Sequence, residues 1–143
     1  MSTVASILSG KHNQVVTIDE YASVLDAAKL MNKHRIGSVV VTRGSSIAGI
    51  ITERDVMAKV VALCNDPATT KVSDTMTSPV MTCSPTTNID ELKRIMREQR
   101  IRHMPVFDDR GLCGMVSIGD LNAYETMALV STVETLEAYI SRS

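Results

Sequence analysis

The chain reads Gly49-Ile50-Ile51-Thr52-Glu53-Arg54-Asp55 and, 65 residues later, Gly114-Met115-Val116-Ser117-Ile118-Gly119-Asp120. Both stretches have a glycine, two apolar residues, a hydroxyl residue and, three positions after the hydroxyl, an aspartate. Consecutive apolar residues are typical of a buried strand, and a hydroxyl followed three residues later by an acid is typical of a helix start. Each stretch therefore predicts a strand that leads directly into a helix.

The repeat extends well beyond these seven residues. A shift of 65 aligns 15–62 with 80–127 without a gap, and nine of the 48 pairs are identical: Val15/Val80, Thr17/Thr82, Met31/Met96, Arg35/Arg100, Ile36/Ile101, Val41/Val106, Gly49/Gly114, Asp55/Asp120 and Ala58/Ala123. A unit of this length buries too little surface to be stable alone, so two copies packed on each other are expected.

Each copy predicts the order β-α-β-β-α. The first copy has strands at 15–18, 38–42 and 47–51 and helices at 24–33 and 53–63; the second has strands at 80–83, 104–107 and 112–116 and helices from 89 and at 118–130. The first helix of each copy has an apolar stripe, Val24, Ala28, Met31 and Ile89, Leu92, Met96. Candidate core positions of the last helices are Val56, Val60, Leu63, Leu121 and Met127.

The domain plan follows from the repeat. The first repeat spans residues 2–64, a polar linker 65–71, the second repeat 72–130 and a helical tail 131–143, and short helices at 4–8 and 72–76 lead into the two repeats. In the tail, apolar residues recur at helical spacing: Met127, Val130, Val133, Leu136 and Ile140. They either pack on a second subunit or dock on their own domain.

Composition narrows the function classes. With 44% hydrophobic residues, 22% charged residues and a net charge of −1, the 143-residue chain is predicted to be one folded domain and not disordered. The balance of 15 basic and 16 acidic residues, with few aromatics, disfavours nucleic-acid binding. No apolar run approaches the roughly 20 residues of a membrane span, and no secretory signal is evident, so a cytoplasmic location is expected.

Catalytic and metal chemistry lack a recognisable motif. Cys64, Cys83 and Cys113 are predicted to fill small apolar pockets, with a redox role as the alternative, and His12, His34 and His103 form no pair at metal-ligand spacing. Residues 114–119 resemble a nucleophile elbow but are one residue too long, and no phosphate-binding glycine loop is present. We expect no enzymatic activity, no catalytic cofactor and no metal.

The two helix starts are the candidate sites. Thr52 with Asp55, and Ser117 with Asp120, place a hydroxyl and a carboxylate near free backbone N–H groups. A nucleotide needs both, because a carboxylate accepts two hydrogen bonds from a ribose diol while the hydroxyl and the helix start hold phosphate. The alternative is a capping box whose only role is to start the helix.

Further candidates carry weaker signals. Arg102 and His103 are predicted either to meet phosphate or to form a solvated turn, and Gly37 and Ser38 occupy their places in the first copy. Thr17 and Thr82 either present polar groups at a strand end or only reflect strand propensity. A cation at Arg54 is disfavoured in a first helical turn unless an anion binds there.

The repeated unit resembles a tandem pair of CBS domains, the module named after cystathionine β-synthase. The resemblance rests on residues 49–55 and 114–120 and on Arg100-Ile101-Arg102-His103-Met104-Pro105-Val106, and it covers about residues 2–130. It implies a mixed α/β (α+β) fold in which two β-α-β-β-α repeats pack as a pseudo-twofold disc. It also implies clefts for an adenosine compound such as AMP, ADP, ATP, NAD or S-adenosylmethionine.

The family pattern assigns expected roles to residues of this chain. Asp55 and Asp120 would hold ribose, and Thr52 and Ser117 would approach phosphate. The adenine would lie among Val16, Thr17, Met81 and Thr82, and the expected site is completed by Gly37, Ser38, Arg54, Arg102, His103, Ile118 and Gly119. Stand-alone pairs of this kind resemble signal-transduction proteins, often homodimers, that sense adenylate or energy state and act on a separate protein; the alternative is a ligand-free scaffold.

Overall fold

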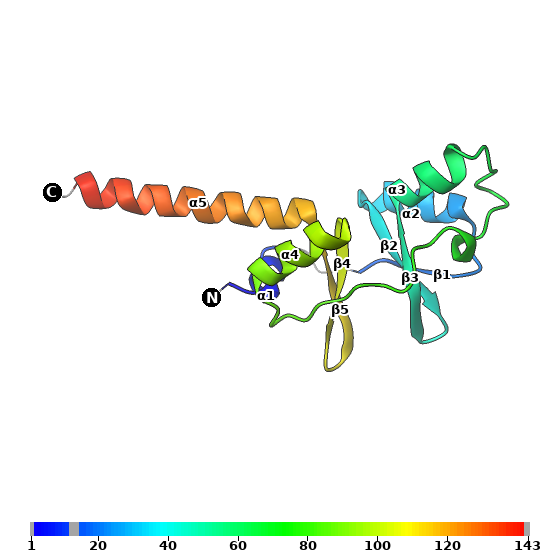
Figure 1. Cartoon of the computed structure of the whole chain (residues 1–143), viewed down its shortest axis with the longest axis horizontal. Helices are drawn as coiled ribbons and strands as arrows, with labels where there is room; N and C mark the ends of the chain where they lie inside the picture. The colour runs from blue at the N-terminus through cyan, green and yellow to red at the C-terminus, as the bar shows by residue number, and fades with distance from the viewer. Residues whose placement is uncertain (1, 12–14, 142–143) are drawn as a thin grey trace.

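The computed structural model describes residues 2–11 and 15–141, which form two repeats joined side by side (Figure 1). In chain order the elements are α1 (Val4–Leu8), β1 (Thr17–Asp19), α2 (Val24–His34), β2 (Ser38–Arg43), β3 (Ser46–Thr52), α3 (Glu53–Val56), the π-helical turn η1 (Met57–Val61), the 3₁₀ turn η2 (Val72–Asp74), α4 (Ile89–Gln99), β4 (His103–Asp108), β5 (Gly111–Ser117) and α5 (Ile118–Ser141). The mixed α/β prediction is confirmed.

Each repeat contains an antiparallel hairpin. In the first, β1 pairs in parallel with β2 and β2 pairs with β3, giving the order β1-β2-β3, whereas β4 and β5 form a two-stranded sheet. Gly44 and Gly111 have φ of 62° and 113° at the hairpin turns, where a side chain would be strained. The predicted hairpins are therefore confirmed.

The strand predicted at 80–83 was wrong. Only Cys83 makes a parallel bridge, to Val106, through hydrogen bonds with the backbone of Pro105 and Phe107. In the first repeat the Val40 N–H donates to the Val16 carbonyl at 3.1 Å. Pro105 occupies the position of Val40 and has no N–H, so the matching bond to Met81 cannot form and the strand is lost.

The amphipathic helices lie largely where their patterns placed them. On α4 the buried residues are Ile89, Leu92 and Met96, as predicted, and on α2 they are Val24, Ala27 and Met31. Ala28, the predicted stripe residue, is only half-buried. The residue buried instead, Ala27, is the repeat equivalent of the buried Leu92. The alignment of the two copies therefore already indicated that Ala27 faces the core.

The last helices differ most from expectation. Val60 and Leu121 are buried and Val56 packs against the core, but Leu63 and Met127 are exposed, which contradicts their predicted core role. The tail is the continuation of α5, a single helix of 24 residues that projects away from the body (Figure 1). Because Val133, Leu136 and Ile140 are exposed, docking of the tail on its own domain is excluded.

The lead-in segments cross between the repeats. Val4, Ile7 and Leu8 of α1 belong to the core of the second repeat, whereas Val72 of η2 belongs to the core of the first. Backbone hydrogen bonds also join each lead-in segment to the other repeat: the Val4 N–H donates to the Thr87 carbonyl, and the Val72 N–H donates to the Ala22 carbonyl. Each core is therefore completed by a segment that precedes the other repeat along the chain.

The cysteines divide into two kinds. Cys64 is exposed, so its predicted place in an apolar pocket was wrong. Cys83 and Cys113 are half-buried and pack against the core of the second repeat. Burial, together with the neighbouring Cys113, raises the pKa of the Cys83 thiol to about 11, so at neutral pH it remains protonated and a poor nucleophile.

Candidate functional site

A cavity of about 260 Å³ lies between the two repeats. The first repeat contributes the segment before β1 and the loop from α2 to β2, and the second contributes β4, β5 and the start of α5. The lining residues are Lys11, Val15, Val16, Arg35, Ile36, Gly37, Ser38, His103, Met115, Ser117 and Asp120. Its wall is thus aliphatic on one part and carries polar and charged groups on another.

The loop between α2 and β2 is shaped to meet the second repeat. Arg35 ends α2 in the left-handed conformation, with φ of 54°, and the Gly37 carbonyl accepts from the Glu53 N–H at 3.0 Å. A Cβ at Gly37 would lie 3.3 Å from His103 Nε2 and 3.1 Å from Glu53 Oε1. A glycine therefore lets this loop approach His103 closely and keeps the cavity narrow at this point.

Asp120 is the central carboxylate of the cavity. Its Oδ2 accepts from the Ser117 N–H at 2.9 Å and from Lys11 Nζ at 2.6 Å, and Lys11 Nζ also donates to the Met115 carbonyl at 2.8 Å. The side chains of Lys11 and Asp120 are 30% and 27% exposed. Asp120 thus reaches solvent in the cavity while it caps α5 and pairs with a cation from the N-terminal segment.

The charges around the cavity set the protonation of its two titratable groups. Burial acts to raise the pKa of Asp120, but hydrogen bonds from Lys11 and the Ser117 N–H outweigh it and leave the pKa below its ordinary value. Burial lowers the pKa of His103, and Glu53 and Asp120 offset this only partly. At neutral pH the cavity therefore holds a carboxylate, a neutral imidazole and the cations Lys11 and Arg35.

The expected site residues fall into four groups. The cavity brings together Val16, Gly37, Ser38, His103, Ser117 and Asp120. Arg54, Arg102 and Ile118 line a different groove, beside α4 and α5. Thr17, Met81, Thr82 and Gly119 are exposed and line neither space, while Thr52 and Asp55 bond to each other at the start of α3.

Sequence reasoning missed two charged residues of the cavity, Lys11 and Arg35, and three apolar ones, Val15, Ile36 and Met115. A signal for Arg35 was present, since Arg35 and Arg100 are an identical pair in the repeat. The sequence held no comparable signal for Lys11, because this residue precedes the aligned region and reaches Asp120 across 109 residues of chain. His12, named among the histidines without ligand spacing, lies outside the described residues.

Asp55 has a different environment from its repeat equivalent. Its carboxylate accepts from the Thr52 N–H and hydroxyl on one oxygen, and from Thr77 Oγ1 and Lys59 Nζ, both at 3.1 Å, on the other. The side chain of Thr52 in turn accepts from the Asp55 N–H, which completes a capping box. With the residue only 8% exposed, both oxygens are engaged in structural contacts.

Replacing Asp55 by Ala is therefore expected to lower the free energy of unfolding by about 1–3 kcal/mol, since a helix cap is lost and Thr77 and Lys59 lose their acceptor. Urea denaturation measures this change. Asp26→Ala, an exposed first-turn aspartate of α2, is the matched control and should cost less. Equal stability of the two variants would contradict the structural role of Asp55.

Comparison with known proteins decides the family. The family model of the CBS domain matches residues 4–62 and 72–125, one match for each repeat. The chain belongs to the CBS-domain family. Both matches together span most of the chain, and each repeat contains the antiparallel hairpin that the duplication predicts.

Relatives support this assignment at the level of whole chains. The CBS domain-containing protein CBSX3 of Arabidopsis thaliana, described as mitochondrial, is 38% identical over 123 residues, which cover 82% of this chain and 60% of that protein. The CBS domain-containing protein YhcV of Bacillus subtilis is 28% identical over 118 residues, 82% of this chain and 84% of that protein. The chain thus spans less than two thirds of the Arabidopsis relative.

Solved structures agree with the fold. A CBS-domain protein of Burkholderia ambifaria, whose proposed role is signal transduction, is 41% identical with a TM-score of 0.81, over 84% of this chain and 90% of that one. A hexameric CBS-CP12 protein from bloom-forming cyanobacteria is 30% identical with a TM-score of 0.76, over 84% and 70% of the two chains. The functional class that these relations support is a regulatory CBS-domain module.

Among residues 2–11 and 15–141, no helix combines the length and the apolar character needed to cross a membrane. Within the same residues, no group of three or more His, Cys, Asp or Glu side chains is arranged to hold a metal ion.

Proposed function

We propose that this CBS-domain pair is a regulatory module that binds an adenosine nucleotide in the cavity between its repeats and carries out no catalysis. The observation that carries the proposal is the partly exposed Asp120 carboxylate, which shares one cavity with the cations Lys11 and Arg35. A carboxylate for a ribose diol and cations for a phosphate are the two polar requirements of a nucleotide.

The remaining lining residues fit the same ligand. The Ser117 hydroxyl and the neutral His103 imidazole offer hydrogen bonds, and Val15, Val16, Ile36 and Met115 offer an aliphatic surface for the base. Among the described residues, no Phe, Tyr or Trp lines the cavity, so the described wall offers adenine mainly aliphatic contacts. The volume of about 260 Å³ lies just below that of typical ligand pockets, which favours a mononucleotide over the larger NAD.

Thermal denaturation in the presence of AMP, ADP, ATP, NAD and S-adenosylmethionine tests the proposal. A ligand at 100 times its dissociation constant should stabilise the protein by about 2.7 kcal/mol. AMP is expected to raise the melting temperature more than NAD at equal concentration. If none of the five compounds changes it at millimolar concentration, the nucleotide proposal fails.

A ligand-free scaffold is the second candidate, and the Lys11–Asp120 pair favours it, because this pair already occupies the carboxylate. In that case binding of a regulated protein would be indifferent to adenosine compounds. We further propose a homodimer, a separate regulated protein and a cytoplasmic location. The hexamer described for the cyanobacterial protein and the mitochondrial description of the Arabidopsis relative apply to those proteins.

Lys11→Met tests how the cavity distinguishes ligands. Methionine has an unbranched side chain of similar length to lysine, so the variant removes the charge of Lys11 while it keeps most of the side-chain volume. Nucleoside binding to Asp120 must displace Lys11, and only a phosphate offers Lys11 a new partner. We therefore expect the variant to reduce the preference for AMP over uncharged adenosine about 10-fold, the value of one charge-assisted hydrogen bond.

Isothermal titration with AMP and with adenosine measures this preference. Lys33→Met, an exposed lysine in the last turn of α2, is the control and should leave the ratio of the two dissociation constants unchanged. An unchanged ratio in Lys11→Met would show that Lys11 takes no part in ligand discrimination.

A further inference from the structure

A groove outside the cavity carries a concentration of positive charge. It has a volume of about 610 Å³ and runs between α4 and the first turns of α5, with Arg54 at its edge. We call it the basic groove; its cations are Arg54, Lys93, Arg97, Arg100 and Arg102. Its floor is apolar and includes Ile101 and Leu121. An apolar floor with a cationic rim fits an occupant that is apolar on one face and acidic beside it.

The charge of the basic groove is not a by-product of the duplication. The equivalent groove of the first repeat, beside α2 and α3, has Ala28, Asn32 and Gly37 at the positions of Lys93, Arg97 and Arg102. That groove also contains Glu53, so its charge is close to balanced. One face of the molecule is therefore strongly basic, whereas its repeat equivalent is not.

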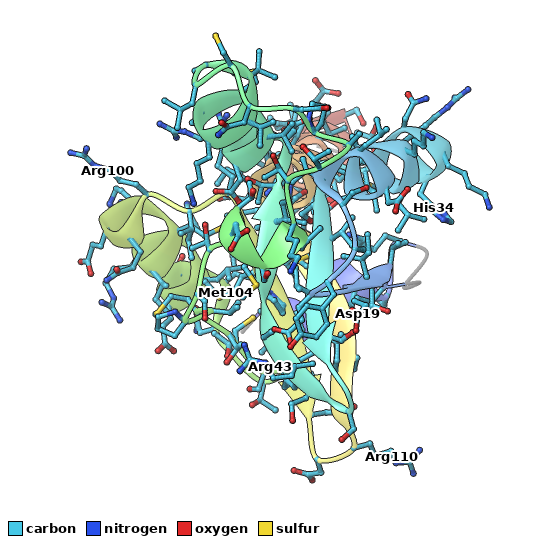
Figure 2. All side chains as sticks on the ribbon, turned by 90° about the vertical axis from the view of Figure 1, so that its right-hand side faces the viewer. Asp19, His34, Arg43, Arg100, Met104 and Arg110 are labelled. Carbon is cyan, nitrogen blue, oxygen red and sulfur yellow. The ribbon has the colours of Figure 1, made fainter. Side chains whose placement is uncertain are left out.

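Most of these cations lack an ionic partner within the described residues. Lys93 pairs with Glu125 at 2.9 Å, but no ion pair within residues 2–11 and 15–141 engages Arg54, Arg97, Arg100 or Arg102. All four arginines are exposed. Figure 2 shows Arg100 extending from the end of α4 away from the body. The rim of the basic groove can therefore accept carboxylates without breaking an existing contact.

The distal half of α5 has the complementary character. Leu129, Val133, Leu136 and Ile140 follow one another at spacings of four, three and four residues and are between 45% and 68% exposed. This spacing lines one face of a helix and is typical of helix pairing. The charged residues of the same half are Glu134 and Glu137, and no Lys or Arg occurs between Ile118 and Ser141.

The distal half of α5 cannot reach the basic groove of its own molecule. Leu121, Asn122 and Glu125, in the first turns of α5, form one wall of that groove. A continuous helix of 24 residues is about 36 Å long and cannot bend back onto its own start. Figure 1 shows α5 leaving the body in one direction. A helix with this face can therefore enter the groove only from another molecule.

We propose that two copies of this chain exchange their α5 helices, each placing its distal half in the basic groove of the other. The two helices then run antiparallel, and one twofold axis relates two identical contacts. The apolar face of Leu129, Val133, Leu136 and Ile140 covers the floor, and Glu134 and Glu137 face the arginine rim. This dimer specifies the homodimer named under the proposed function and rests on that part of it. It does not depend on nucleotide binding, so the test of the dimer and the test of nucleotide binding can fail independently.

Sedimentation equilibrium of the full chain tests the exchange by charge reversal. The unaltered chain should be a dimer, and the double variants Arg97→Glu/Arg100→Glu and Glu134→Arg/Glu137→Arg should each raise the dimer dissociation constant about tenfold or more, because attraction becomes repulsion. The quadruple variant, in which both signs are reversed, should recover most of the loss. Arg110→Glu, at the β4–β5 turn, is the control for net charge and should leave the constant unchanged.

Three outcomes would overturn the proposal. The unaltered chain could remain monomeric throughout the concentration range. The dimer could persist in both double variants, which would place the interface elsewhere. The quadruple variant could remain as weak as the sum of the two double variants, which would show that the two charged groups do not face each other.

Discussion

Replacing Asp120 by Asn is expected to weaken AMP binding about 100-fold. The carboxylate accepts two hydrogen bonds from a ribose diol, and hydrogen bonds to a charged group contribute about 1.5–3 kcal/mol each. Asn presents one acceptor oxygen and no charge, so most of that free energy is lost. Isothermal titration measures the dissociation constant, and urea denaturation of the same variant reports any change in fold stability.

The stability measurement separates binding from capping. The Asn side chain can still accept from the Ser117 N–H, so the free energy of unfolding should fall by only about 1 kcal/mol. Asp90→Asn, in the first turn of α4, makes the same change at an exposed position of the same repeat and should leave binding unaltered. If Asp120→Asn binds AMP as tightly as the unaltered chain, Asp120 serves only as a helix cap.

The second large effect concerns the packing of α1 on the second repeat. Leu8 is buried in that core, and a Cβ added to Gly114 would lie 2.9 Å from its Cδ2 and 3.1 Å from its Cδ1. Leu8→Ala removes buried methyl groups and should cost about 2–5 kcal/mol. Gly114→Ala overpacks the same point and should cost about 1–3 kcal/mol.

The double variant gives the decisive result. Leu8→Ala removes the atoms with which a Cβ at Gly114 collides, so the double variant should be more stable than the sum of the two losses predicts, by about 1 kcal/mol or more. Urea denaturation of the unaltered chain, the two single variants and the double variant gives the four free energies of unfolding that this double-mutant cycle needs. Simple addition of the two losses would mean that α1 does not rest on β5 in solution.

Much of the fold was predictable because its signals are local. The apolar stripe of Ile89, Leu92 and Met96 depends only on helical periodicity, and the turns at Gly44 and Gly111 depend only on their own backbone angles. The strand predicted at 80–83 does not form, and the cause lies in a different segment, β4. Its bonding partner would have been the N–H at position 105, which proline lacks.

The candidate site was only partly predictable for a similar reason. Six of the expected residues line one cavity, since they occupy repeat positions that the two copies bring face to face. Arg54 and Arg102 are near it in sequence but point to the basic groove. Sequence spacing identifies which residues begin a helix, but which space a side chain enters depends on the neighbouring repeat.

By itself the sequence determined the duplication, the order of elements and the two hydroxyl–aspartate helix starts, because periodicity, turn chemistry and capping are properties of short segments. Only the tertiary structure decided which groups surround each aspartate. Thr52 engages one oxygen of Asp55, and Lys59 and Thr77 engage the other. Lys11, from the N-terminal segment before the aligned copies, pairs with an Asp120 that reaches solvent. Equivalent motifs thus acquire different surroundings, since the partners of a side chain are set by contacts between segments distant along the chain.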